Sequence, residues 1–267
     1  MTNNNKYKIL VLSDLKEGTS TALKNTISLS KMVDADIELF HVIKPIDVVE
    51  TDSQLSAMRT ISKKHIKVEK KIRKLIDPIS EDYGSIIHSS FTIGNVKNEI
   101  EDKIKKTKPD IIVLGKRKPK KLSFIGDSIT EFVLNTHKDI VMIASGTQSL
   151  EPEKELSLGF FNNEKQSFES NLIETLISQT DQSLKSFNIV DKLNQTPNEL
   201  PSTTNKKVDF VFEKNDNVYQ TLSSYLVKNK VNLLCVGRID QAKTQKVNTV
   251  KLQDVIDKVD VSLLLTS

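Results

Sequence analysis

Apolar and polar residues along this chain of 267 residues follow one pattern twice. Residues 95–115 and, 122 positions later, residues 217–237 each place apolar side chains at steps of four and then run without interruption into a glycine. Steps of four put side chains on one face of a helix, and an unbroken apolar run is typical of a strand buried on both faces of a parallel sheet. The repeat therefore predicts two related α/β units.

The flanking segments extend this repeat to five strands in each half. An opening strand, a helix and a second strand come before the repeated unit, and a short helix and a last strand follow it. Thr19 or Ser20 is the expected N-cap of the first helix. The expected first, second and last strands are residues 8–13, 36–43 and 140–144 in one half and 156–161, 187–190 and 261–265 in the other.

Alternation of strands and helices predicts a parallel sheet with helices on both faces. The predicted fold class is α/β, with two tandem open five-stranded parallel-sheet domains. The domains are expected at residues 1–146 and 155–267, joined by a linker near 146–154. The last strands of the two halves are expected to pair edge to edge and form an intrachain pseudo-dimer, because both are short, apolar and otherwise exposed.

The two halves differ in length. Asp14 lies 101 positions before Gly115, whereas Asn162, taken as the match of Asp14, lies 75 positions before Gly237. Residues 51–76 carry an apolar stripe that predicts a long helix, with His65 packed along it. The corresponding residues 194–205 contain two prolines and many small polar residues, which are typical of a loop. The second domain is therefore expected to be reduced by one helix.

Composition narrows the class of protein. A single cysteine, Cys235, excludes an intramolecular disulfide framework and is expected to be a small core residue, and the four histidines lack metal-ligand spacing. No apolar run of membrane-spanning length and no signal peptide are present, which predicts a cytoplasmic protein without membrane contact. No catalytic triad, Cys/His pair or paired-carboxylate motif is recognisable, so an enzyme is not indicated.

Four segments together resemble the universal stress protein family in its tandem two-domain form. They are the opening strand and turn at 9–18, the second-strand end at 41–43, the run 112–115 and the last helix starting Ser128-Ile-Thr-Glu. The resemblance covers residues 6–146 directly and residues 155–267 through the repeat. It implies an adenine nucleotide alpha-hydrolase-like fold and, because some members bind ATP, a nucleoside site at Leu12, Asp14 and Val42. From the residues alone, Asp14 could equally cap the following turn.

The family's phosphate loop has the pattern Gly-x2-Gly-x9-Gly-(Ser/Thr), and here it is altered. Gly115 is in place, Lys118 replaces the second glycine, and Gly126 lies one residue early, before Asp127 and Ser128. Glycines let backbone N–H groups approach phosphate closely, so their loss weakens such a loop. Asp127 would repel phosphate, or it simply caps the last helix.

A basic run offers an opposite signal. Residues 116–121 contain five cations, among them Lys116, Arg117 and Lys118, at the end of a strand where open α/β sheets bind ligands. These cations could hold an anion without glycines, or form a solvated loop. Charge is unevenly divided: residues 1–150 hold 25 Lys/Arg and 19 Asp/Glu, and the remainder hold 14 and 16. Nucleic-acid binding by the run is disfavoured because no aromatic residue is interleaved to stack bases.

These observations favour a non-enzymatic stress-response or regulatory protein with a degenerate nucleotide loop and no metal site. One alternative is a sensor that binds ATP or AMP, with Mg²⁺, through the first domain alone. A second is a weak nucleic-acid-associated protein using the basic loop. The second half has no glycine after Gly237, so no nucleotide site of the family type is expected there, and this half is expected to serve packing. A homo-oligomer and a protein partner both stay open.

Overall fold

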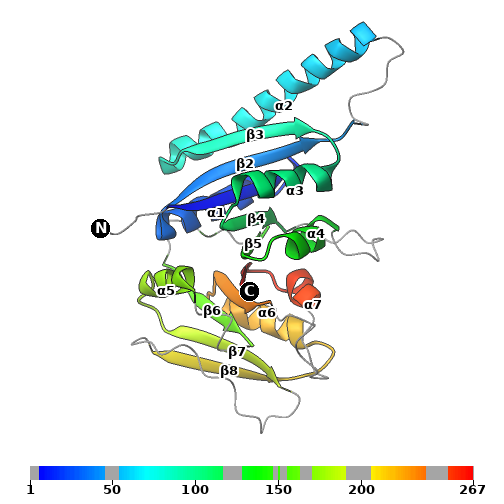
Figure 1. Cartoon of the computed structure of the whole chain (residues 1–267). Coiled ribbons are helices and arrows are strands. Elements are labelled where there is room, and N and C mark those ends of the chain that lie inside the picture. Colours follow the sequence, from blue (N-terminus) through cyan, green and yellow to red (C-terminus); the bar gives the residue numbers. More distant parts are fainter. Residues whose placement is uncertain are drawn as a thin grey trace.

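The computed structural model describes residues 6–45, 54–116, 128–146, 150, 155–162, 170–190, 206–238 and 252–266. Within these residues, ten strands form one sheet in the order β3-β2-β1-β4-β5-β10-β9-β6-β7-β8. Helices lie on both faces of the sheet (Figure 1). The α/β class and the two tandem five-stranded units predicted from the sequence are confirmed.

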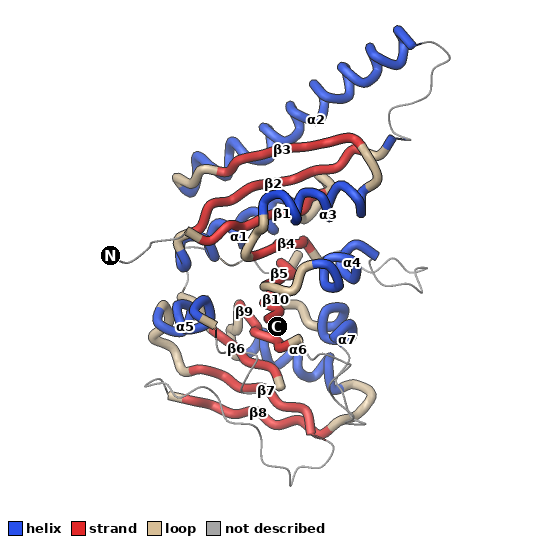
Figure 2. The backbone as a smooth tube through the Cα atoms, in the orientation of Figure 1, coloured by secondary structure: helices blue, strands red, loops and turns tan. Residues whose placement is uncertain are grey.

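Each half has the same order of elements, apart from one helix. The first half consists of β1 (Tyr7–Ser13), α1 (Thr19–Val33), β2 (Ala35–Ile43), α2 (Gln54–Tyr83), β3 (Ile87–Ile93), α3 (Val96–Thr107), β4 (Ile111–Gly115), α4 (Ser128–Thr136) and β5 (Ile140–Ala144). The second consists of β6 (Leu158–Phe161), α5 (Asn171–Ser178), β7 (Leu184–Val190), β8 (Lys207–Glu213), α6 (Val218–Lys228), β9 (Leu233–Gly237), α7 (Leu252–Lys258) and β10 (Ser262–Thr266). Figure 2 shows the red strands of both halves as one continuous layer.

The two halves join at β5 and β10. These strands pair antiparallel, with Met142 opposite Leu264, whereas the other strand pairs in the sheet are parallel. This is the edge-to-edge arrangement expected from the sequence, displaced by one residue at β10. Both strands are almost wholly buried, so their pairing removes two apolar edges from water. One hydrophobic core on each face of the sheet includes residues from both halves.

The helix α2 ends later than the pattern predicted, and the expected residues 51–53 lie outside the described residues. It continues through Pro78 to Tyr83, seven residues past the expected end. A proline removes one backbone hydrogen bond from a helix and normally ends or kinks it. Here Ile76 and Ile79, on either side of Pro78, are both buried against the sheet, and this packing offsets the lost bond.

The second half has no room for a helix of this kind. Only 16 residues separate Val190 from Lys207, fewer than the 30 residues of α2. The side chains on the corresponding face of the sheet also differ between the two halves. Leu39 on β2 packs in the core beneath the α1 and α2 side, and the aligned position on β7 is Ser186, which accepts a hydrogen bond from Asn188 at 2.8 Å. A polar residue thus stands on β7 at the position where β2 has the apolar Leu39.

Candidate functional site

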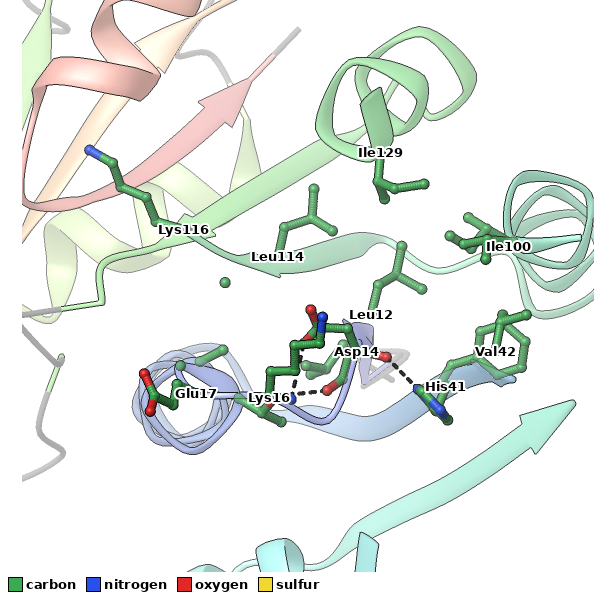
Figure 3. Close-up of a pocket in the computed structure, with 18 of the residues that line it drawn as sticks. Leu12, Asp14, Lys16, Glu17, His41, Val42, Ile100, Leu114, Lys116 and Ile129 are labelled. Atoms are coloured by element: carbon green, nitrogen blue, oxygen red, sulfur yellow. Dashed lines mark hydrogen bonds between the residues drawn. The ribbon is translucent and has the colours of Figure 1, made fainter. Parts of the chain in front are cut away.

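A cavity of about 620 Å³ lies at the carboxyl ends of β1, β2 and β4 (Figure 3). In the strand order β3-β2-β1-β4-β5, the chain reverses its direction of travel between β1 and β4. Open α/β sheets bind ligands at this switch point, because the loops from neighbouring strands diverge there and leave a crevice. The cavity therefore lies where the fold itself predicts a binding site.

The cavity has an apolar interior and a polar rim. Its apolar lining comes from three strands and two of the helices that cover them, and includes Leu12, Phe40, Val42, Ile100, Leu114 and Ile129. Its polar lining includes Asp14, Lys16, Glu17, Thr19, His41 and Lys44. An apolar interior with a few convergent polar groups is the usual form of a small-molecule site, and the volume lies within the usual range for such sites.

The turn after β1 carries most of the polar rim, and side chains hold its shape. Ser13 Oγ lies 2.9 Å from Thr19 Oγ1 and accepts a hydrogen bond from the Leu15 backbone N–H. Asp14 Oδ1 accepts from the Lys16 N–H at 3.0 Å. Leu15 has a φ of 56°, in the left-handed region, so these bonds stabilise a backbone that the turn would not adopt unaided. Asp14 therefore does cap its turn, the structural role that the sequence left open.

The helix α1 starts in the wall of the cavity. Its N-cap is Gly18, with a φ of 91°, in place of the expected Thr19 or Ser20. Thr19 Oγ1 instead lies against Ser13, and no side chain caps the helix N-terminus. The first N–H groups of a helix carry partial positive charge, so the rim favours a negatively charged or hydrogen-bond-accepting group at this point.

His41 is a cavity residue that the sequence did not single out. Its Nδ1 lies 2.8 Å from the backbone oxygen of Ser13. A carbonyl oxygen only accepts, so Nδ1 is the donor, and the bond fixes the ring at the junction of β1 and β2. The signal that could have identified it is its place beside Val42 at the carboxyl end of a predicted strand.

Five of the nine residues predicted for the site line this one cavity: Leu12, Asp14, Val42, Gly115 and Lys116. Parallel strands bring their carboxyl ends to one edge of the sheet, which is why residues more than 100 positions apart meet here. Arg117, Lys118, Gly126 and Asp127 lie outside the described residues. Ser128 begins α4.

The Lys116 side chain, predicted to take part in anion binding, makes its contacts with the second half. Its ammonium donates to the backbone oxygen of Val259 at 2.6 Å and lies 3.9 Å from Asp260 Oδ1, both in the second half. Figure 3 shows it directed away from Asp14. Burial lowers the pKa of Lys116. The negative charges of Asp260 and Asp257 act in the opposite direction and raise it. The cation is drawn there because the carbonyl groups after a helix C-terminus carry partial negative charge.

The strand register also corrects the match between the halves. Ile9 pairs with Ile111, and Leu158 pairs with Leu233, 122 positions after Ile111. Asn162 therefore corresponds to Ser13, and the counterpart of Asp14 is Asn163, which lies outside the described residues. The one-residue error arose because opening strands of similar composition can be aligned in either of two adjacent registers.

Neither a metal cluster nor a membrane-spanning helix occurs in the described part of the chain. No three His, Cys, Asp or Glu side chains there come together as a metal site would require. None of the helices described combines the length and the apolar character needed to cross a bilayer.

Two open five-stranded α/β units in tandem, with a cavity at the switch point of the first, define the class of open α/β folds whose sheet ends can hold ligands. Comparison by sequence is more specific, since the model of the universal stress protein family matches residues 7–144, more than half of the chain. The chain belongs to the universal stress protein family. A search of curated proteins found no sequence match.

Solved structures show the same architecture. A universal stress protein from Archaeoglobus fulgidus aligns over 99% of this chain and 98% of its own, with a TM-score of 0.67 and 14% identity. A putative universal stress protein from Pseudomonas aeruginosa aligns over 98% and 93%, with a TM-score of 0.57 and 11% identity. An Arabidopsis thaliana family protein with AMP bound covers 52% of this chain and 90% of its own, with a TM-score of 0.36 and 18% identity. At these identities, the first two show that the tandem fold is shared.

Proposed function

We propose that this chain is a non-enzymatic universal stress protein whose first half senses a nucleoside or nucleotide in the cavity at the ends of β1, β2 and β4. The observation that carries the proposal is that the three nucleoside-site residues implied by family resemblance, Leu12, Asp14 and Val42, line one cavity of about 620 Å³ at the switch point of the sheet. A cavity of this volume is large enough for a nucleotide.

The chemistry of the lining supports a nucleoside. Apolar side chains such as Val42, Ile100 and Ile129 provide a surface against which a flat base can be buried. Asp14 at the rim supplies carboxylate oxygens, which accept hydrogen bonds from the two hydroxyl groups of a ribose. Charge-assisted hydrogen bonds of this kind are about twice as strong as neutral ones.

The phosphate side is less well provided. The Lys116 ammonium is directed to Val259, and the loop after β4 has Lys118 and Asp127 where the family pattern has glycines. Lys16, Lys44 and the α1 N-terminus lie at the rim and can take one phosphate. Affinity is therefore set mainly by the base and ribose, and adenosine, AMP and ATP are expected to bind within about tenfold of one another, with or without Mg²⁺.

The test is a titration of the full chain with adenosine, AMP and ATP, in which binding is measured by calorimetry and by the shift in melting temperature. Asp14→Asn keeps an oxygen that can cap the turn but removes the charge, so it is expected to weaken nucleoside binding about tenfold at unchanged stability. Asp36→Asn is the matched control, because Asp36 is exposed at the opposite end of β2. Saturable binding of none of the three compounds at millimolar concentration would overturn the proposal, as would release of phosphate at enzyme-like rates.

A further inference from the structure

The most strongly charged surface of the described structure is one face of α2. From Arg59 to Lys74 the helix carries eight Lys or Arg residues and one acid, Glu69. Glu69 pairs with Arg73 at 2.7 Å, so the other seven cations have no acidic residue within this segment to pair with. Figure 1 shows α2, in cyan, extending beyond the sheet at its N-terminal end.

The cations lie together on the side of the helix that faces solvent. At 100° per residue they fall within an arc of about 180°, centred opposite the apolar stripe. The stripe members Val68, Ile72, Ile76 and Ile79 are buried against the sheet. All the cations of the segment are exposed except Lys64, which is half-buried. The basic face of α2 comprises Arg59, Lys63, Lys64, Lys67, Lys70, Lys71, Arg73 and Lys74.

The packing of α2 bears on what this face can bind. A helix that lies in a lipid surface inserts a continuous apolar side, and here the apolar side from Val68 onward is packed against the sheet, which leaves only Met58 and Ile66 as exposed large apolar residues among the described side chains of the helix. Single-stranded nucleic acid is held by aromatic side chains that stack on bases, and the segment 59–74 contains no Phe, Tyr or Trp. What the helix offers is closely spaced positive charge without stacking groups.

Closely spaced positive charge without stacking groups is suited to the phosphate backbone of a nucleic-acid duplex. The segment from Arg59 to Lys74 is about 22 Å long, at 1.5 Å per residue. The major groove of DNA is about 12 Å wide and admits an α-helix, with phosphates along both sides. A basic arc of about 180° can face both rows of phosphates at once. We propose that the basic face of α2 binds the phosphate backbone of double-stranded nucleic acid, independently of its sequence.

Among the described residues this surface occurs once, since the 16 residues between β7 and β8 are too few for a helix of the length of α2. It is also separate from the nucleotide cavity, whose lining includes no residue of α2. Binding of the duplex and binding of a nucleoside can therefore succeed or fail independently.

The test measures fluorescence anisotropy of a labelled 24-base-pair DNA duplex of arbitrary sequence with the full chain, from 50 to 200 mM NaCl. If about six cations contact phosphates, log K is expected to fall against log salt with a slope of about −5, a loss of affinity of about a thousandfold over this range. Two duplexes of unrelated sequence are expected to bind within about threefold of each other.

A quadruple variant, K63Q/K67Q/K70Q/K74Q, removes four exposed cations from the centre of the arc. It is expected to reduce the slope to about −2 and to weaken duplex binding at least a hundredfold at 50 mM NaCl. The matched control, K106Q/K138Q/K214Q/K228Q, loses the same charge from exposed lysines elsewhere and is expected to stay within about threefold of the parent. Equal losses in the two variants would overturn the proposal, because they would indicate a general charge effect.

Two controls establish that the α2 variant is intact. Circular dichroism with thermal melting shows whether it keeps its fold, and nucleoside titration shows whether the cavity is unchanged.

A separate experiment tests other anionic partners. Polyglutamate and phosphatidylserine vesicles serve as the alternative probes. If the protein bound either probe at concentrations where it does not bind the duplex, the proposal would be overturned. The partner would then be an acidic protein or a membrane surface.

Discussion

Lys116 and Arg238 occupy the same position in the two halves, 122 residues apart, and each donates to a carbonyl group just beyond the end of a helix in the other half. Lys116 Nζ lies 2.6 Å from the oxygen of Val259, which follows α7, and Arg238 Nη1 lies 2.8 Å from the oxygen of His137, which follows α4. His137 and Val259 are themselves 122 residues apart. The two cations therefore form a reciprocal pair of contacts across the β5–β10 junction.

Arg238 is the stronger of the two contacts. Its second terminal nitrogen also donates to the Lys138 carbonyl at 2.7 Å, so one planar guanidinium satisfies two carbonyl groups after α4. Burial lowers the pKa of Arg238, and Asp139 opposes this shift. Hydrogen bonds to charged groups contribute about 1.5–3 kcal/mol each, and the helix dipole adds to them.

We predict that Arg238→Met lowers the free energy of unfolding by about 2–4 kcal/mol, because it removes two charged hydrogen bonds to the carbonyl groups of His137 and Lys138. Lys116→Met removes one such bond and should lower it by about 1–2 kcal/mol. Urea unfolding followed by circular dichroism measures both. Lys138→Met is the control, since its exposed side chain makes none of these contacts, and it should change stability by less than about 0.5 kcal/mol. If all three variants changed the free energy of unfolding equally, the stabilising role of the reciprocal contacts of Lys116 and Arg238 would be contradicted.

His137 gives stability a dependence on pH. Burial lowers the pKa of His137 below its usual value of 6.5; Asp139 opposes this shift and the nearby Arg238 adds to it. The folded protein therefore binds fewer protons than the unfolded chain once the pH falls below about 6.5. Stability is expected to decrease as the pH is lowered from 7.5 towards 5.

His137→Leu should flatten that decrease, while His88→Gln, on an exposed histidine of β3, should leave it unchanged. Urea midpoints at several pH values provide the measurement. If His137→Leu kept the full slope, the dependence would have to come from other groups.

Gly159 is required by packing in the second half. A Cβ at this position would lie 2.8 Å from Leu234 Cδ1, 3.1 Å from Val231 Cγ1 and 3.2 Å from Phe187 Cε2, all in the core. Gly159→Ala is therefore expected to cost about 1–3 kcal/mol. Gly115→Ala is the counterpart in the first half, where the nearest contacts of a Cβ are 3.6 Å, and its cost should be below about 1 kcal/mol. Thermal melting of the two variants compares them directly.

Cys235 should be unreactive in the folded protein. Its side chain is fully buried in β9, and burial raises the pKa of its thiol to about 12. At pH 8 only about one thiol in 10⁴ is then ionised, and the thiolate is the reactive form. We expect no labelling by Ellman's reagent over an hour in buffer and complete labelling of one thiol in 8 M urea. Rapid labelling of the native protein would show that β9 opens readily.

Several elements could be predicted from sequence because local pattern decides them. Ile111–Leu114 and Leu233–Val236 are continuous apolar runs, and each is fully or almost fully buried in the sheet. Leu12, Asp14 and Val42 were identified through the family resemblance, and parallel topology explains why they meet, since parallel strands end at one edge. The reduced second half followed from the two prolines and short polar residues that stand where the first half has α2.

Other features depended on partners far along the chain. The N-cap Gly18 was missed because Thr19 bonds to Ser13 in place of capping the helix. The expected helix ended at residue 76, whereas the burial of Ile76 and Ile79 carries α2 through Pro78 to Tyr83. The register of β6 became evident only from its pairing with β9.

The sequence by itself determined the number of strands and their alternation with helices in each half, because hydrophobic periodicity specifies these locally, and family resemblance added the residues Leu12, Asp14 and Val42. Tertiary structure alone decided where Lys116 directs its charge. A run of cations at the end of a strand suggests an anion site, but the carbonyl of Val259 lies 143 residues away and is brought within 2.6 Å only when β5 pairs with β10. In the folded molecule the Lys116 ammonium bonds to this carbonyl oxygen, which carries partial negative charge. The local sequence around Lys116 contains no sign of a partner so far along the chain.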